Sequence, residues 1–558
     1  MALDAGRSAR HGLAVLKDAR KDLTVADLTG GNGQDSLHRA ADAFSHASDE
    51  LSSPLLAPVR VLPVIGRQVR SAAALSGSAA EAANLGADIL REMKQIVDKG
   101  LPPGPARVDA LRESARIAAS GRRQLQALDL GPNDGLVGPL GRARDRMAKA
   151  LDELEQAMGD AADGAGSMAD VMHGPTTWLL LATNNAEMRS GSGMFLSGAT
   201  LHFDDGRVSL SDVRSLADMV LPDPVPITDV DLGARWGWTG LDRDFRNVAF
   251  SPRFPATAEQ ASRMWSAATG EHVDGVVALD VAGVATFLQA VGPLTVDDQT
   301  IDAGSAIPFL MHDQYADLDT QSPERRERLG RVARALFDRI DQPGVDIPKV
   351  GQAVRDATQG RHLMVWSADR TLQSVWEQVD VAGALKNDSL LVGIDNSGGN
   401  KLDQYVRVNA ALSSVATSDG TDVTVDFRMT NTPSGGDPTY ILGTKGGRYD
   451  GFLSISLPRQ ATAVSLTGDG AVAALGADGP TSQVVSRAIS LDPQAVASLR
   501  LSFHVPSSMP SLRVEPSARV PAINWTSAGG AWTDDELAVV TLGQQGKVDK
   551  PDVPGVSG

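Results

Sequence analysis

The pattern of apolar and polar positions changes twice along the chain, and these changes divide it into three regions. In the first region apolar side chains recur every three or four residues, as at Leu85, Ile89, Met93 and Ile96, which is the period of an amphipathic helix. Clusters of glycine and proline interrupt this pattern often enough for four or five helices. Because such helices bury their apolar stripes only against one another, residues 1–172 are predicted to form a helical bundle or stalk.

In the second region, residues 173–385, short apolar runs alternate with helical segments. The run WLLLA at residues 178–182 predicts a buried strand, and MFLSGATLHF predicts the next strand of a hairpin. Thr257 followed by Gln260 has the capping-box spacing of a helix start, and Asp280 is expected to cap the helix that follows the strand GVVALD. Strands that alternate with helices on this scale predict an α/β domain with helices covering a sheet.

The third region has the period of β-strands. Residues 423–429, VTVDFRM, alternate strictly between apolar and polar side chains, which is typical of a half-buried strand. Turn sequences rich in glycine separate further short strands, so residues 386–545 are predicted to form a β-sandwich of roughly seven strands. Residues 546–558 are predicted to be a disordered tail. The whole chain is therefore expected to be a multidomain α+β protein.

Composition narrows the classes of function. The chain has 558 residues and a formal net charge of −17, with no concentrated Lys/Arg surface in any region, so no nucleic-acid partner is expected. Cysteine is absent, which excludes disulfides, thiolate metal sites and cysteine nucleophiles. No apolar run approaches the roughly 20 residues that cross a bilayer.

A polar turn directly after the predicted strand at residues 178–182 is the leading candidate site, because binding groups concentrate in connections that leave strand ends. Arg189 is either an anion ligand or bound to a neighbouring carboxylate, and the asparagines either face a ligand or satisfy the turn's backbone. No G-x-S-x-G elbow surrounds the serines, so a serine hydrolase is not expected. The polar side chains of the turn are Asn184, Asn185, Glu187, Arg189, Ser190 and Ser192.

Several motifs resemble a family of actinobacterial and other prokaryotic envelope proteins known only as a domain of unknown function. The motifs are NNAEMR at residues 184–189, FDDGRV, VDGVVALD, QAVGPLTV and, at residues 396–405, NSGGNKLDQY. In that family a membrane helix and a helical stalk precede an NNAExR motif. The resemblance implies an extracytoplasmic protein held at the membrane by an N-terminal helix that is not present in this chain.

The order of LLLATNN, RSGSGMFLSGATL, DDGRVSLSDVRS and the segment ending in QAVGPLTV is also similar to LytR-CpsA-Psr proteins. These are extracytoplasmic phosphotransferases that move glycopolymers from polyprenyl pyrophosphate carriers onto the cell wall. The resemblance implies a similar fold for the central α/β domain and a pyrophosphate gripped by Arg189 and Arg214. The chain departs from that family at the positions of the family's acidic metal ligands. Asn184 or Asn185 stands at the first of these positions, Gly191 at the second, and Ser215 near the third.

Two functions remain open at this point. In the first, the protein is a non-catalytic or divergent module that binds envelope glycopolymer or a polyprenyl-pyrophosphate-linked glycan, and the missing acidic ligands favour it. In the second, it is an active phosphotransferase, and only then is Mg²⁺ expected as a cofactor. The candidate catalytic residues are Arg189, Arg214 and Glu187, and the candidate ligand-binding residues are Asn184, Asn185, Ser190, Ser192 and Asp218.

Overall fold

A computed structural model of the chain describes residues 7–8, 11, 32–316, 328–342, 344–543 and 548–549. The protein is a mixed α+β protein with an N-terminal helical region and strand-rich sheets in its C-terminal part, as the sequence predicts. It divides into two compact units, one that ends at Gly174 and one that covers Pro175–Pro551. Most of the predicted disordered tail lies outside the described residues, apart from the two-residue strand β21 (Val548–Asp549).

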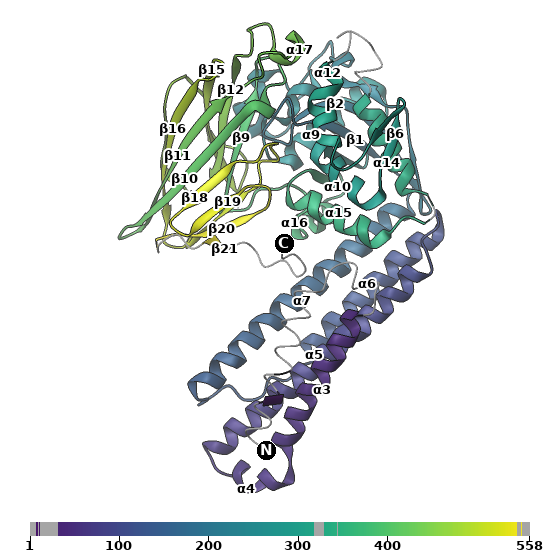
Figure 1. Cartoon of the computed structure of the whole chain (residues 1–558), viewed down its shortest axis with the longest axis vertical. Helices are drawn as coiled ribbons and strands as arrows, with labels where there is room; N and C mark the ends of the chain where they lie inside the picture. The colour runs from purple at the N-terminus through teal and green to yellow at the C-terminus, as the bar shows by residue number, and fades with distance from the viewer. Residues whose placement is uncertain are drawn as a thin grey trace. The chain divides into compact units, whose positions relative to one another are not determined.

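The described residues of the first unit contain two antiparallel pairs of long helices. Helix α3 lies along α5, and α6 lies along α7 (Figure 1). The contact between α3 and α5 is lined mostly by alanines such as Ala40 and Ala83, together with Phe44, so the two backbones approach closely. The helices are α3 (Asn32–Ser52), the short α4 (Ala57–Arg60), α5 (Ile65–Asp98), α6 (Pro105–Gln126) and α7 (Gly138–His173).

The second unit contains a six-stranded central sheet in the order β3-β2-β1-β5-β8, with β4 paired to β2. Strands β1 and β5 are parallel, and the other pairs are antiparallel. The carboxyl ends of β1 and β5 therefore meet at one edge, where Thr183 pairs with Asp280. The strands are β1 (Thr176–Asn184), β2 (Met194–Asp204), β3 (Arg207–Leu210), β4 (Arg214–Ser215), β5 (Gly275–Asp280) and β8 (Leu363–Ser367).

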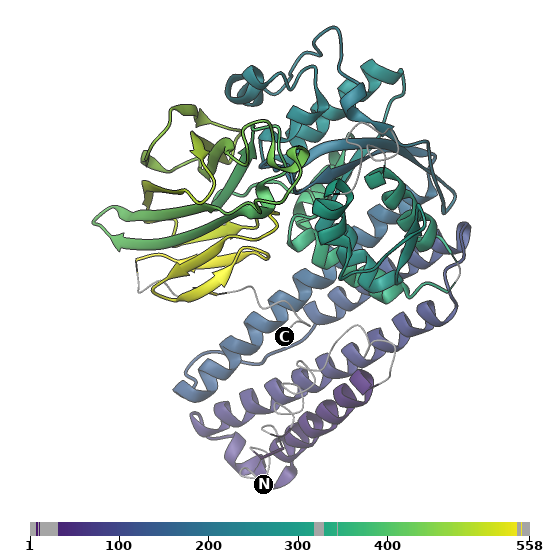
Figure 2. The same ribbon diagram turned by 45° about the horizontal axis from the view of Figure 1, so that its top comes forward.

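Helices cover both faces of the central sheet. Leu179 and Leu181 of β1 pack with Trp265 of α9 in one apolar cluster, while Leu180, which points to the opposite face, is also buried. Helix α14 contacts β1, α10 contacts β5 and α15 contacts β8. These helices belong to the teal and green group beside the central sheet in Figure 2. The main helices here are α8 (Val230–Trp236), α9 (Phe254–Thr269), α10 (Val281–Val291), α14 (Arg328–Ile340), α15 (Ile347–Gln359) and α16 (Arg370–Gln378).

One helix start is confirmed and another is wrong. The side chain of Asp280 accepts a hydrogen bond from the backbone N–H of Gly283 at 2.8 Å and so caps α10, as predicted. Helix α9 begins at Phe254, three residues before the predicted capping box. Pro255 in its first turn has a pre-set helical φ, and the hydroxyl of Thr257 donates to the carbonyl of Phe254 at 3.1 Å.

The C-terminal strands form a two-layer sandwich with more strands than predicted. The inner sheet has the order β14-β15-β12-β9-β17-β20-β21, and the outer sheet has the order β13-β16-β11-β10-β18-β19. The prediction of roughly seven strands was too low because several edge strands of four to six residues show no clear alternation. The strands are β9 (Ser389–Asn396), β10 (Val406–Ala416), β11 (Gly420–Asn431), β12 (Tyr449–Pro458), β13 (Thr462–Thr467), β14 (Val472–Ala477), β15 (Ser482–Leu491), β16 (Val496–Pro506), β17 (Ser511–Glu515), β18 (Asn524–Ser527), β19 (Gly530–Thr533) and β20 (Ala538–Thr541).

The inner sheet lies between the outer sheet and the α/β part of the second unit. The sandwich core joins side chains of both sheets, such as Ile394 of β9 and Phe427 of β11. Strand β9 is buried along its whole length, because its other face packs on the turn after β1, where Gly393 contacts Ser190. One face of the outer sheet is therefore left to the solvent, and polar side chains alternate along it.

Candidate functional site

The turn between β1 and β2 is buried inside the second unit. Its side chains at Asn184, Asn185, Arg189, Ser190 and Ser192 are each at most 4 % exposed. The turn lies at the edge where β1 and β5 end together, and the inner sheet of the sandwich covers it. The predicted site residues of the turn itself are thus brought together, but their neighbours are other residues of the chain.

The two asparagines are hydrogen-bonded to protein groups. Asn185 donates from Nδ2 to Asp280 Oδ2 and to the carbonyl of Ala518, both at 2.8 Å, and its Oδ1 accepts from the N–H of Val281 at 3.0 Å. Asn184 donates to the hydroxyl of Tyr315 at 2.9 Å. Asn185 therefore joins the ends of β1 and β5 to a loop of the sandwich.

The carboxylate of Asp280 also contacts Ser192 and His362 at this edge of the sheet. It accepts from the hydroxyl of Ser192 at 3.1 Å and lies 2.8 Å from Nδ1 of His362. Burial lowers the pKa of His362, but the Asp280 carboxylate outweighs burial, and the net direction is upward. No described hydrogen bond joins Ser192 to His362, so the geometry lacks the contact through which a base activates a hydroxyl.

Arg189 and Ser190 bind the last two residues of β9. The Arg189 guanidinium donates to the carbonyls of Met188 and Asn396 and lies 4.6 Å from the ring centroid of Phe250. Burial lowers the pKa of Arg189. The N–H and the hydroxyl of Ser190 both donate to Asp395 Oδ1, at 2.8 and 3.0 Å, and burial raises the pKa of Asp395 to about 6.

Glu187 forms a buried ion pair with Lys401. The ammonium of Lys401 also lies 4.4 Å from the ring centroid of Tyr315 and 5.1 Å from that of Tyr440. Burial lowers the pKa of Lys401, but Glu187 and the two tyrosines outweigh burial and raise it. The segment NSGGNKLDQY, which stood out in the sequence, is thus the partner of the NNAEMR turn.

Arg214 and Asp218 lie apart from the buried turn. Both side chains are exposed, and the guanidinium of Arg214 lies 5.9 Å from the ring centroid of Trp265. The described contacts give Arg189 and Arg214 no common partner. The donor groups of the turn do not fit Mg²⁺, because its one carboxylate, Glu187, is paired with Lys401. Within the described ranges, no group of three or more His, Asp or Glu side chains is placed to hold a metal ion.

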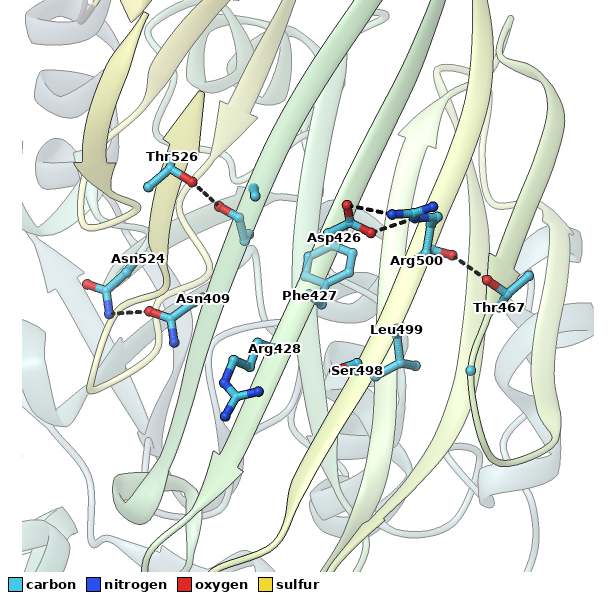
Figure 3. A pocket seen from close by; sticks show the side chains of 13 residues that line it. Asn409, Asp426, Phe427, Arg428, Thr467, Ser498, Leu499, Arg500, Asn524 and Thr526 are labelled. Atoms are coloured by element: carbon cyan, nitrogen blue, oxygen red, sulfur yellow. Dashed lines mark hydrogen bonds and ion pairs between the residues drawn. The ribbon is translucent and has the colours of Figure 1, made fainter. Parts of the chain in front are cut away.

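A second polar cluster, absent from the sequence prediction, lines a hollow of about 570 Å³ on the solvent face of the outer sheet (Figure 3). Asp426 accepts from Nε and Nη2 of Arg500 at 2.6 and 3.0 Å, and Asn524 donates to Asn409 at 3.3 Å. Arg428 also lines the hollow, and Figure 3 shows its side chain between Asn409 and Ser498, with the guanidinium directed away from the Asp426–Arg500 pair. The outward side chains that line the hollow are Asn409, Ala411, Asp426, Arg428, Thr467, Ser498, Arg500, Asn524 and Thr526.

Strand register builds the hollow as two cross-strand rows, which we call the amide row and the carboxylate row. In the amide row Ser498, Arg428, Asn409 and Asn524 are successive partners on four neighbouring strands. In the carboxylate row the partners are Arg500, Asp426, Ala411 and Thr526. Ala411 is the one short apolar side chain of the two rows, and its size leaves space in the middle of the face.

The chain is therefore a mixed α+β protein in which Arg189 and Glu187 of the turn bond to other protein groups, while a second polar cluster lies on the solvent face of the outer sheet. The model of one protein family, described as a protein of unknown function (DUF4012), matches residues 173–315. The matched residues include strands β1 to β5 of the central sheet, but not β8, and they include the NNAEMR turn. No curated protein and no solved structure matches the chain.

Proposed function

We propose that this protein binds an envelope glycopolymer in the hollow of the outer sheet and that it acts as a non-catalytic module of envelope polysaccharide assembly. The observation that carries the proposal is the amide row, which presents two amides, a hydroxyl and a guanidinium on one open face. A flat face with this chemistry suits an extended ligand rich in hydroxyl groups.

The charges in the hollow favour an anionic glycan. Arg500 is neutralised by Asp426, whereas the described contacts give Arg428 no carboxylate partner. A guanidinium in this position suits a phosphate or carboxylate group, which it binds with two parallel hydrogen bonds. Such a cation is notable in a chain with a net charge of −17.

The sequence resemblances support the envelope setting of this proposal. We place the protein outside the cytoplasm and assign residues 173–385 to a LytR-CpsA-Psr-like domain that keeps the family's order of elements. Because Arg189 and Glu187 are bound by protein groups, the central domain serves to carry the sandwich rather than to transfer a phosphoryl group. A polyprenyl-pyrophosphate-linked glycan remains a suitable ligand through its sugar part.

Calorimetric titration of the whole chain with a glycan that carries phosphate or uronate groups tests the proposal, with a neutral glycan of similar length for comparison. Arg428→Ala is expected to weaken binding of the anionic glycan about tenfold or more, because a hydrogen bond to a charged group contributes about that factor to affinity. Arg207→Ala removes an equally exposed arginine from the distant strand β3 and is expected to bind as the wild type does.

Two results would overturn this function. One is equal affinity of Arg428→Ala and the wild type, which would place the ligand elsewhere. The other is release of polyprenyl phosphate from a polyprenyl pyrophosphate analogue in the presence of Mg²⁺, abolished by Arg189→Ala. That result would establish the transferase instead.

A further inference from the structure

The connection between α3 and α5 contains a cluster of apolar side chains that are exposed to the solvent. We call residues 53–65 the apolar tip; it lies at the end of this helix pair, where Figure 1 labels α4. Single exposed apolar residues are ordinary on protein surfaces, but a cluster of them marks an interaction site. The exposed fractions are 75 % for Leu55, 81 % for Val61, 48 % for Leu62, 68 % for Val64 and 52 % for Ile65.

The backbone of the apolar tip is fixed by its own hydrogen bonds. Arg60 donates from Nη2 to the carbonyls of Leu51 and Ser53, at 2.5 and 3.3 Å, and so satisfies the last carbonyls of α3. Arg70 donates to the carbonyl of Arg60 at 2.7 Å. A Cβ at Gly66 would overlap that carbonyl oxygen, so the glycine permits the close approach. The apolar side chains are therefore held outward by a defined conformation.

The loop between α6 and α7 extends this surface. Gln68 donates to the carbonyl of Gly135 at 2.8 Å and accepts from the N–H of Val137 at 3.0 Å. These bonds hold the loop beside the start of α5, and Val137 is itself 52 % exposed. The apolar surface thus has contributions from two connections of the first unit.

Within residues 51–80 the net charge is positive, opposite in sign to that of the whole chain. Residues 51–80 contain no aspartate or glutamate but include Arg60, Arg67 and Arg70, although the chain carries a net charge of −17. In the described part of the unit, these three arginines donate to backbone carbonyls and form no ion pair with a carboxylate. Arg67, for example, bonds the carbonyl of Asp134 rather than its side chain.

We propose that the apolar tip docks the first unit on the surface of an anionic phospholipid bilayer. Leu55, Val61 and Val64 would enter the boundary between headgroups and acyl chains, and the arginines would lie among the phosphates. A second copy of the tip is a poorer partner, because pairing two tips brings their arginines together. No helix in the described part of the chain is long and apolar enough to cross a membrane, so the contact proposed is interfacial.

Co-sedimentation of the whole chain with vesicles tests this proposal independently of glycan binding. The chain is expected to bind vesicles of phosphatidylcholine and phosphatidylglycerol and to bind much less to phosphatidylcholine alone, with affinity falling as salt rises. Val61→Asp with Leu55→Asp is expected to lower the partition coefficient at least tenfold. Arg67→Gln is expected to lower it about fivefold, since one basic residue near an anionic surface contributes about that factor.

Val230→Asp is the matched control, because Val230 is also 81 % exposed but lies at the start of α8 in the second unit. It is expected to bind vesicles as the wild type does. The proposal is overturned if the wild type does not bind anionic vesicles. It is also overturned if the variant that combines Val61→Asp with Leu55→Asp binds them as well as the Val230→Asp control does. It is also overturned if Val61→Asp converts a dimer into a monomer in light scattering without affecting vesicle binding.

Discussion

Several charged side chains of this protein are buried against groups that are distant in sequence. Asp395 is fully buried and accepts hydrogen bonds from Ser190 and from the hydroxyl of Ser454, the latter at 2.6 Å. Burial nevertheless raises the pKa of Asp395 to about 6, because three donors do not replace the hydration of a carboxylate. The folded protein therefore holds a proton at this position more tightly than the unfolded chain.

This difference predicts a pH dependence of stability. The Asp395 carboxyl titrates near pH 3.9 in an unfolded chain and near pH 6 in the fold. Between these values the folded state binds more protons, so the free energy of unfolding falls as the pH rises, by about 3 kcal/mol in all. The contribution is present below about pH 4 and lost above about pH 6.

Asp395→Asn cannot titrate, and it isolates this effect. In urea unfolding measured across this pH range, the wild type is expected to lose stability relative to the variant as the pH rises from about 4 to about 6. Above that range the difference between the two proteins should be constant. A difference that does not change with pH would show that Asp395 keeps an ordinary pKa.

At the scale of elements, the fit of strand β9 against the turn after β1 depends on a glycine. A Cβ at Gly393 would lie 2.6 Å from the Cβ of Ser190 and would overlap its hydroxyl. That hydroxyl is held by its hydrogen bond to Asp395, so it cannot turn away without cost. The absence of a side chain at Gly393 thus allows the inner sheet to cover the turn.

Gly393→Ala is therefore expected to lower the free energy of unfolding by about 1–3 kcal/mol, the usual effect of overpacking. Gly351→Ala provides the control, since Gly351 is exposed in α15 and a Cβ there meets nothing within 4 Å. That substitution is expected to stabilise the protein by about 1 kcal/mol, because alanine favours a helix over glycine. Equal stability of Gly393→Ala and the wild type in chemical denaturation would contradict the proposed fit.

At the scale of the whole molecule, the α/β part and the sandwich of the second unit share a polar junction around the turn after β1. Lys401 pairs with Glu187, Asn185 bonds the carbonyl of Ala518, and Asp395 bonds Ser190. Breaking a buried ion pair such as the first of these strongly destabilises a protein, by about 3–5 kcal/mol. Separation of the two parts would expose or leave unpaired every group in this junction.

A fragment of residues 175–543 is therefore expected to unfold in a single transition. Calorimetry is the measurement, and agreement of the calorimetric with the van't Hoff enthalpy is the criterion. A fragment of residues 386–543 alone is expected to be less stable than the sandwich within the longer fragment, because Lys401 loses its partner. Two separate transitions in the longer fragment would show that the junction does not couple its two parts.

Features that depend on neighbours along the chain could be predicted from the sequence. The alternation at residues 423–429 correctly separated Phe427, which is buried, from Asp426 and Arg428, which face the solvent. The cap at Asp280 and the helical period of the first unit were predicted for the same reason. Side-chain periodicity and capping depend on residues close together in the chain, although the equally local capping-box pattern at Thr257 did not mark the start of α9.

Which distant residues come into contact could not be predicted, because it depends on how the elements pack. The NNAEMR turn is polar in sequence, but whether it faces a ligand or the protein depends on the segment at residues 395–403, about 200 positions away, that covers it. The rows of the outer sheet likewise depend on the register of four strands, which alternation along one strand does not specify. Register and burial are set by the packing of the whole unit, and that packing placed the open polar surface on the sandwich.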